Sequence, residues 1–393
     1  MTRSRRHNKY GKKIILLISI SVLVIYWSIW AYKIIKKDQQ LDFQTYYYAG
    51  TAYLEGENPY LLSTLMDLST TEIDRPFLYP PITLNFFAPF SMFSYEVSFI
   101  IYLMLKLLCL AMLIFLWHKY FLKTAEETII LIVSCLLAFH ETILIDIVSG
   151  NIVIFEQLVL WTGIIALLKR RSWIFPLAIL VTAQFKLMPI LLIFLGLTLP
   201  HKERKEVFYF LPIGFIISII MQLLVWPELS MYFLNNLGLP NEIDSINPSA
   251  FSLFQELSLA LAGKGSYILA NIHYVLYSLL FGGIILVIFL VWKRIKETNK
   301  LELFIMFLLT AYALLSPRFK DYSYVLLIVP SVYILVYVVK NIYLRIFLGF
   351  IFWIHLFEYQ NLLALFIMFC LYSNYFVRAP TSKKGSHMDF YLF

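Results

Sequence analysis

One carboxylate, Asp42, directly follows the first long apolar segment of the chain, where that segment would leave a membrane. A carboxylate partly buried at the boundary between water and lipid can act as a general base towards a substrate hydroxyl. Asp42 also stands where it would cap a helix predicted over 43–55, by accepting backbone N–H groups. The two roles are compatible, and the sequence leaves both open.

Four cations are candidate partners of an anionic substrate group. Lys106 and Lys186 lie inside apolar segments, where a lysine is costly and is expected to face the bundle interior and mark a site. Pairing with Glu141 or another acid is the alternative for Lys106, whereas Lys186 is expected to contact a phosphate or a sugar. Arg318 and Lys320 follow a Ser-Pro helix stop. They bind either anionic lipid headgroups or a lipid-linked phosphate, which arginine can hold through two hydrogen bonds.

Further polar residues flank a predicted tight turn, Ser149-Gly150-Asn151, and are expected to line the same cavity. Each could equally be a hydrogen-bonded structural group. The tyrosines after Asp42 indicate an aromatic belt at the membrane interface, from which one or two could stack on a sugar. The candidate substrate-binding residues of these two kinds are Tyr46, Tyr79, His140, Glu141, Asn151, Glu156 and Gln157.

Motifs of soluble enzymes are absent: the chain has no Walker loop, Rossmann glycine fingerprint, HExxH or GxSxG. It has no Asp-x-Asp pair either, which disfavours a metal-bound nucleotide sugar as substrate. The three cysteines lie in apolar segments without metal-ligand spacing. Neither a metal nor a cofactor is therefore expected.

The elements that must position these residues are membrane helices. Of 393 residues 61% are hydrophobic, and the mean hydropathy is +0.77, against about 45–50% apolar residues in soluble domains. The net charge of +8 comes from short Lys/Arg clusters between apolar segments, which indicate cytoplasmic loops rather than a nucleic-acid surface. They predict a multi-pass protein of the plasma (bacterial inner) membrane with both termini in the cytoplasm.

The predicted architecture is all-α, with residues 1–378 forming a single membrane domain and 379–393 a disordered cytoplasmic tail. Two outer loops, 36–79 and 227–270, are expected to carry helices of their own, including amphipathic ones in the first. Residues 80–94 are too short to span the membrane and predict a half-helix or re-entrant element. About twelve crossings are expected, over 14–35, 96–117, 126–147, 152–168, 173–199 (a short hairpin that bends near 184–189 and counts as two), 207–226, 271–292, 301–315, 323–339, 346–357 and 360–376.

Short motifs in a fixed order resemble glycosyltransferase family 87, which includes polyprenol-phosphate-mannose-dependent mannosyltransferases of the GT-C superfamily. The motifs are Asp42-Phe43 with Tyr46-Tyr47, Gly56 and Pro59-Tyr60; Tyr79-Pro80-Pro81 with Phe87, Pro89 and Phe90; Gly150-Asn151; Lys186 with Pro189; and Ser316-Pro317-Arg318 through Tyr322 to Pro330. The resemblance implies a GT-C fold, a polyprenyl-phosphate sugar donor, inversion at the anomeric carbon and a catalytic base at Asp42. Two departures are Gly150-Asn151 where the family often has Gly-Gln, and Arg318-Phe319-Lys320 where it often has an aromatic residue or histidine.

The resulting hypothesis is a glycosyltransferase in the lipid bilayer that moves a hexose, with mannose as the expected sugar. The donor is a polyprenyl-phosphate sugar, whose tail would enter near residues 79–93, and the acceptor is a lipid-linked or cell-envelope glycan on the outer face. Lys186, Arg318 and Lys320 would neutralise the leaving phosphate. A polymerase or ligase, or a flippase, of polyprenyl-linked glycans is the alternative. The glycosyltransferase hypothesis requires Asp42, Lys186 and Arg318 to line one cavity.

Overall fold

The computed structural model describes residues 2–37, 40–69, 73–171, 173–237, 247–262, 271–295, 301–353 and 359–378. All regular structure in these ranges is helical, which confirms the predicted fold class. Glu358, predicted at an outer turn, and the predicted tail 379–393 lie outside the described residues.

Six helical segments of the described ranges are long and apolar enough to cross a membrane. They belong to α1 (Thr2–Lys37), α5 (Tyr95–Tyr120), α10 (His201–Val225), α14 (Ile272–Ile295), the run from η5 (Asp321–Leu327) through α16 (Ile328–Tyr333) to η6 (Ile334–Val338), and α18 (Gln360–Arg378). A further pair is long and apolar enough only when taken together and is bent: α6 (Ala125–Val133) and η3 (Ser134–Ala138) meet α7 (His140–Ser149) at 63°, as in a broken span or a re-entrant loop.

Each remaining predicted crossing corresponds to a helix too short to span a bilayer alone, since about 20 residues are needed. These helices are α8 (Val153–Leu168), α9 (Ile174–Phe185), η4 (Met188–Thr198), α15 (Leu301–Leu315) and α17 (Ile342–Trp353). The break between α9 and η4 falls at Lys186 and Leu187. This break falls within the bend predicted near 184–189, and α9 and η4 pack on each other.

The first outer loop forms α2 (Leu41–Glu55) and α3 (Leu62–Leu68). The stretch 80–94, predicted as a half-helix or re-entrant element, forms three short helical pieces, η1 (Pro81–Thr83), α4 (Leu84–Phe87) and η2 (Phe90–Met92). Gly56 ends α2 in the left-handed conformation, with φ +78°. The predicted amphipathic helix differs in one respect, because α2 is buried around most of its circumference by α3, α4 and η2. Phe43, for example, stacks on Tyr102 of α5 at 4.2 Å between ring centroids.

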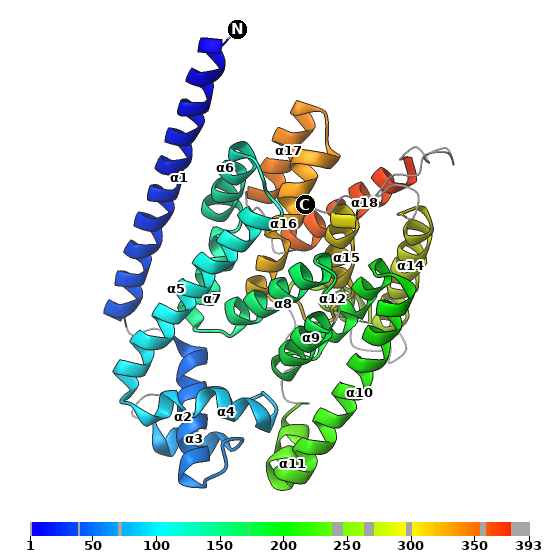
Figure 1. Ribbon diagram of the computed structural model, residues 1–393. Coiled ribbons are helices and arrows are strands. Elements are labelled where there is room, and N and C mark those ends of the chain that lie inside the picture. The colour runs from blue at the N-terminus through cyan, green and yellow to red at the C-terminus, as the bar shows by residue number, and fades with distance from the viewer. Residues whose placement is uncertain are drawn as a thin grey trace.

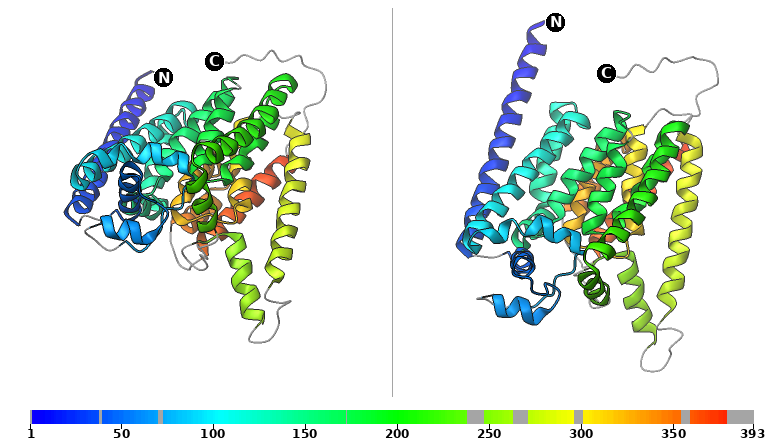
Figure 2. Two further views of the ribbon diagram at one scale, coloured as in Figure 1. Left: turned by 90° about the horizontal axis from the view of Figure 1, so that it is seen from below. Right: turned by 60° about the horizontal axis from the view of Figure 1, so that its bottom comes forward.

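The helices of both outer loops gather at one end of the molecule. Figure 1 shows α2, α3 and α4 beside α11 (Pro227–Asn236), at the end opposite the start of α1, and Figure 2 agrees from a second direction. A second helix of the later loop, α12 (Ala250–Ala262), packs on α14. The prediction that the outer loop 227–270 carries helices of its own is thus confirmed. Helix α1 stands at the edge of the bundle and packs on α6.

Candidate active site

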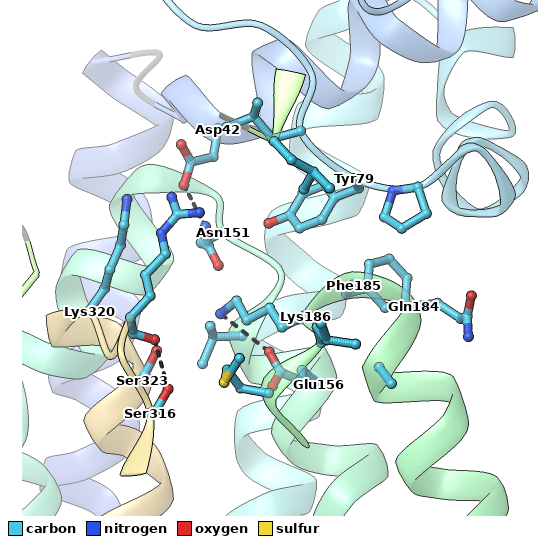
Figure 3. A pocket seen from close by; sticks show the side chains of 18 of the residues that line it. Asp42, Tyr79, Asn151, Glu156, Gln184, Phe185, Lys186, Ser316, Lys320 and Ser323 are labelled. Atoms are coloured by element: carbon cyan, nitrogen blue, oxygen red, sulfur yellow. Dashed lines mark hydrogen bonds and ion pairs between the residues drawn. The ribbon is translucent and has the colours of Figure 1, made fainter. Parts of the chain in front are cut away.

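A cavity of about 930 Å³ opens where segments far apart in the sequence meet (Figure 3). Its walls come from the start of α2, the loop before η1, the α7–α8 turn, the α9–η4 break, α10, α11 and the loop after α15. Asp42, Lys186 and Arg318 all line it, as the glycosyltransferase hypothesis requires. Of the other candidates, the cavity brings together Tyr46, Tyr79, Asn151, Glu156, Gln157 and Lys320.

Asp42 lies inside the first turn of α2 rather than at its cap. The N-cap position belongs to Gln40, and no side chain caps the helix, so the predicted capping role of Asp42 is wrong. The Asp42 side chain is 16% exposed, and its Oδ2 accepts a hydrogen bond of 2.7 Å from Nδ2 of Asn151. A carboxylate in the first turn is also stabilised by the positive end of the helix dipole. The other carboxylate oxygen, Oδ1, lies 3.8 Å from the Arg75 guanidinium.

The turn between α7 and α8 exists because of Gly150. This residue ends α7 in the left-handed conformation, with φ +71°, which favours glycine. A Cβ atom here would lie 2.8 Å from Cβ of Phe43 and 2.9 Å from Cβ of Gln40. Glycine therefore lets the start of α2 rest on the turn, and this contact brings Asn151 against Asp42.

Lys106 of α5 holds the same turn from beneath. Its ammonium lies 2.8 Å from Oδ2 of Asp146 and donates to the carbonyl oxygens of Asp146 and Asn151 at 2.5 Å each. Both side chains are fully buried, and neither lines the cavity. The predicted alternative for Lys106, pairing with an acid, is therefore correct, but the acid is Asp146 and not Glu141.

Two tyrosines stand beside Asp42. The hydroxyls of Tyr46 and Tyr79 are 2.9 Å apart, and Nδ2 of Asn151 lies 3.4 Å from the Tyr46 hydroxyl. Burial raises the pKa of Tyr46 and of Tyr79, so both stay neutral O–H groups at ordinary pH. Neutral hydroxyls can donate to or accept from a sugar as well as from each other.

Lys186 occupies the break that ends α9, where the backbone turns to an extended conformation. Its ammonium lies 3.3 Å from Oε2 of Glu156 on α8 and 4.9 Å from the ring centre of Tyr322. Gln157 is the next residue of α8, and it also lines the cavity. In Figure 3 the Lys186–Glu156 pair lies beyond Asn151 as seen from Asp42.

The loop after α15 carries Arg318 and Lys320 on the side of the cavity facing Lys186 (Figure 3 labels Lys320). The later outer loop braces it. Asn247 donates to the Pro317 carbonyl at 3.2 Å and accepts from the Phe319 amide at 2.9 Å. Ser249 donates to the same Pro317 carbonyl at 2.7 Å. The sequence placed this Asn-Pro-Ser segment on the same face, but the structure adds its role as a support.

His140 and Glu141 do not line the cavity, so that expectation is wrong. The bend between η3 and α7 turns His140 towards α1, where its ring packs on Tyr26 at 5.4 Å and on Trp30 at 6.1 Å between centroids. Glu141 is exposed at the start of α7. Counting helical turns back from Gly150 assumes a straight helix, so the sequence could not predict this bend.

The apolar wall of the cavity also differs from the expectation. From the stretch 79–93, predicted to admit a prenyl tail, only Tyr79, Pro80 and Pro81 line it. The apolar wall also includes Phe215, Ile219 and Leu223 of α10, Phe233 and Leu234 of α11, and Leu237 just after α11. Within the described ranges, no three His, Cys, Asp or Glu side chains lie close enough together to hold a metal ion.

Comparison with known proteins identifies a family for this chain. The sequence model of glycosyltransferase family 87 matches residues 77–317, a segment that contains Tyr79, Asn151 and Lys186 and begins after Asp42. No similar curated protein and no similar solved structure was found. The match covers more than half of the chain, and the chain belongs to glycosyltransferase family 87.

Proposed function

We propose that this membrane glycosyltransferase moves a hexose, with mannose as the expected sugar, from a polyprenyl-phosphate donor to a lipid-linked or cell-envelope glycan. One observation carries the proposal: a carboxylate, Asp42, and the two cations of one loop, Arg318 and Lys320, line the same cavity. The first is suited to activate an acceptor hydroxyl and the others to receive a leaving phosphate. This function requires neither a metal nor a cofactor.

In the proposed reaction Asp42 takes the proton of the acceptor hydroxyl. The acceptor oxygen attacks the anomeric carbon while the bond from that carbon to the phosphate oxygen breaks, and its electron pair stays on the phosphate. The products are an inverted glycoside, a polyprenyl phosphate and a protonated Asp42, which returns its proton to water. Asn151 holds the carboxylate through the 2.7 Å hydrogen bond, and it can orient the basic oxygen without removing its charge.

Charge and shape support the proposed donor. Arg318 and Lys320 can form charge-assisted hydrogen bonds to the phosphate as negative charge grows on it. The apolar side chains of α10 and α11 offer a surface for the prenyl tail, which gains free energy with each buried methylene group. Several of them, Ile219 and Leu223 among them, are half exposed on the outside of the bundle. A tail there would pass from the lipid into the cavity.

We propose the orientation of the chain in the membrane from the positions of its basic clusters. The basic clusters at the ends of α5, α8 and α14 lie opposite the cavity end of the molecule. By the positive-inside rule we place these clusters and both termini in the cytoplasm, and the cavity on the outer face of a bacterial plasma membrane.

The test is transfer from labelled polyprenyl-phosphate sugars to a cell-envelope glycan extract, with detergent-purified wild type and Asp42→Asn. We expect Asp42→Asn to lower the transfer rate about 10³-fold, because general base catalysis contributes about 10²–10⁴-fold. Asp67→Asn makes the same change at an exposed residue of the same outer loop, on α3, and should act like wild type. Full activity in Asp42→Asn would refute the mechanism. Translocation of the lipid-linked sugar without glycoside formation would establish a flippase instead.

A further inference from the structure

Two adjacent polar residues interrupt an otherwise apolar helix. In α8, VIFEQLVLWTGIIALL, Glu156 and Gln157 are the only ionisable or amide side chains. They are 6% and 4% exposed, yet both line the cavity. Burying a carboxylate and an amide among apolar helices costs free energy unless hydrogen bonds compensate for the lost water.

The protein itself supplies few of those hydrogen bonds. Within the described residues Gln157 has no hydrogen-bond partner, and Glu156 has only the Lys186 ammonium at 3.3 Å. Oδ1 of Asn151, one turn earlier at the start of α8, is also buried without a partner there. Buried polar groups are nearly always satisfied. Three such groups beside one cavity indicate that something entering the cavity satisfies them.

The position of these groups narrows the choice of ligand. In Figure 3 Asn151 lies between Asp42 and the Lys186–Glu156 pair, with Lys320 across the cavity. If the phosphate of a donor binds Arg318 and Lys320, and the acceptor hydroxyl meets Asp42, the sugar ring occupies the space between them. Its hydroxyl groups then face Glu156 and Gln157.

We infer that Glu156, Gln157 and Lys186 form a subsite for the sugar ring of the donor, and that this subsite selects a neutral hexose. The inference rests on the proposed function. Sugar hydroxyls both donate and accept, so they can donate to the Glu156 carboxylate and to the Gln157 carbonyl oxygen and accept from the Lys186 ammonium. Lys186 is then a sugar contact, and the phosphate belongs to Arg318 and Lys320.

The preference for a neutral sugar follows from the balance of charge. Lys186 and Glu156 neutralise each other across 3.3 Å. A uronic acid would bring a carboxylate against Glu156, and an amino sugar would bring an ammonium against Lys186. Either ligand leaves a like-charge contact in a poorly solvated place, which is an effective way to reject a substrate.

The experiment measures coupling between single sugar hydroxyls and single side chains. Short-chain polyprenyl-phosphate mannose, glucose and galactose first identify the sugar that wild type transfers. Donors in which one hydroxyl of that sugar is replaced by hydrogen are then compared in wild type, Glu156→Gln and Gln157→Met. A glucuronate donor tests charge. Thr162→Val changes a polar residue of the same helix that is exposed and lies outside the cavity, and it serves as the control.

We expect at least one hydroxyl deletion to lower kcat/KM about 10–100-fold in wild type and in Thr162→Val, since a buried hydrogen-bonding group is left without its partner. In Gln157→Met at least one of these deletions should cost about threefold or less, because the amide that it would leave unpaired in wild type is already absent. Glu156→Gln should also raise the use of the glucuronate donor relative to the neutral one by about tenfold, since it removes the opposing carboxylate.

The experiment distinguishes a wrong subsite assignment from a wrong proposed function. If wild type transfers no sugar from any donor, the proposed function is wrong and the subsite with it. If wild type transfers a sugar but every deletion costs the same in the variants, the function stands and the subsite is wrong; Glu156 and Gln157 then bind only water. Melting temperatures of the variants in detergent identify any loss of folding, and the ratios between donors are internal to each folded variant.

Discussion

Two lysines lie among apolar helices, each beside one carboxylate, and their surroundings differ. In the first pair, which we name the sealed pair, Lys106 and Asp146 are 2.8 Å apart, and neither side chain is exposed. In the second, the cavity pair, Lys186 and Glu156 are 3.3 Å apart, with 27% and 6% of their side chains exposed. Only the cavity pair lines the cavity.

The two pairs differ in how many N–H donors of the lysine ammonium face oxygens of the chain. The three N–H donors of Lys106 face three oxygens of the chain: one carboxylate oxygen and two carbonyls. Among the residues that the structure describes, Lys186 has one such oxygen, that of Glu156, and the face of one tyrosine ring. An intramembrane charge is a candidate functional site by default. Here one of the two, Lys106, holds the turn that carries Asn151. For the other, Lys186, we propose that its ammonium keeps donors for a ligand.

The largest effect we predict is the loss of folded protein in Lys106→Met. Removing one partner of a buried ion pair leaves the other charge uncompensated, which costs about 3–5 kcal/mol. We expect most of the variant to aggregate, and the remainder to melt well below wild type, as measured by size exclusion and thermal unfolding in detergent.

The double variant Lys106→Met/Asp146→Leu sharpens this prediction. It removes both charges, so folded yield should return towards that of wild type. Lys119→Met on the same helix changes an exposed lysine and should have no effect. A single Lys106→Met variant with a normal yield would show that the sealed pair is not structural.

Lys186→Met should have the opposite effect, because it should lower transfer and leave folding nearly unchanged. Because this lysine is 27% exposed at a cavity, the Glu156 left behind can reach water, so folding changes little. Transfer should fall about 10²-fold, as expected when a charge-assisted contact to a bound substrate is lost. Melting and kcat/KM are measured on the same preparation.

Lys202→Met, at an exposed position outside the cavity, is the control for Lys186→Met. If Lys186→Met unfolds as Lys106→Met does, the cavity pair is structural like the sealed pair, and the proposed difference between them is wrong. It is also wrong if Lys186→Met folds and transfers sugar at the wild-type rate.

Gly150→Ala tests whether the turn that the sealed pair supports also positions Asp42, the proposed base. A methyl group at Gly150 would collide with Phe43 and Gln40 at the start of α2, so it should move Asp42 away from Asn151. We expect kcat to fall about 10–100-fold, since a displacement of about 1 Å of a catalytic group costs roughly 10²-fold.

Gly56→Ala is the matched control for Gly150→Ala. Gly56 also has a left-handed backbone, with φ +78°, but nothing lies within 4 Å of its added Cβ. Both variants carry a similar backbone cost of about 1–2 kcal/mol, and only Gly150→Ala should lose transfer. Equal activity in the two variants would mean that the contact does not position Asp42.

The sequence predicted the parts of the site that depend on one segment at a time. Asp42 after the first span, the turn at Gly150 and the break beside Lys186 each follow from local signals: an apolar run that ends, a glycine, and a segment too short to cross twice. All twelve predicted crossings have a helical counterpart in the described residues. Their local patterns agree with the tertiary structure, as expected for a foldable chain.

Contacts between segments were harder to predict. Periodicity shows which residues share a helix face but not which neighbour that face meets, so the prediction that Lys106 pairs with Glu141 or another acid did not identify Asp146. The bend of 63° before α7 then turned His140 and Glu141 away from the cavity. The apolar wall from α10 and α11 and the contribution of Arg75 depend on segments that no local signal connects to Asp42.

We expect the smallest effect from a substitution of Arg75, which forms an exposed ion pair with Asp42. Its guanidinium is 3.8 Å from Asp42, and the arginine side chain is 55% exposed. Exposed pairs of this kind contribute about 0–1 kcal/mol, so Arg75→Gln should change kcat/KM about threefold or less. The change should shrink further as salt rises, because salt screens exposed charges. A loss of about 30-fold or more would instead make Arg75 a third phosphate ligand beside Arg318 and Lys320, since contacts to a charged substrate group contribute more than exposed ion pairs.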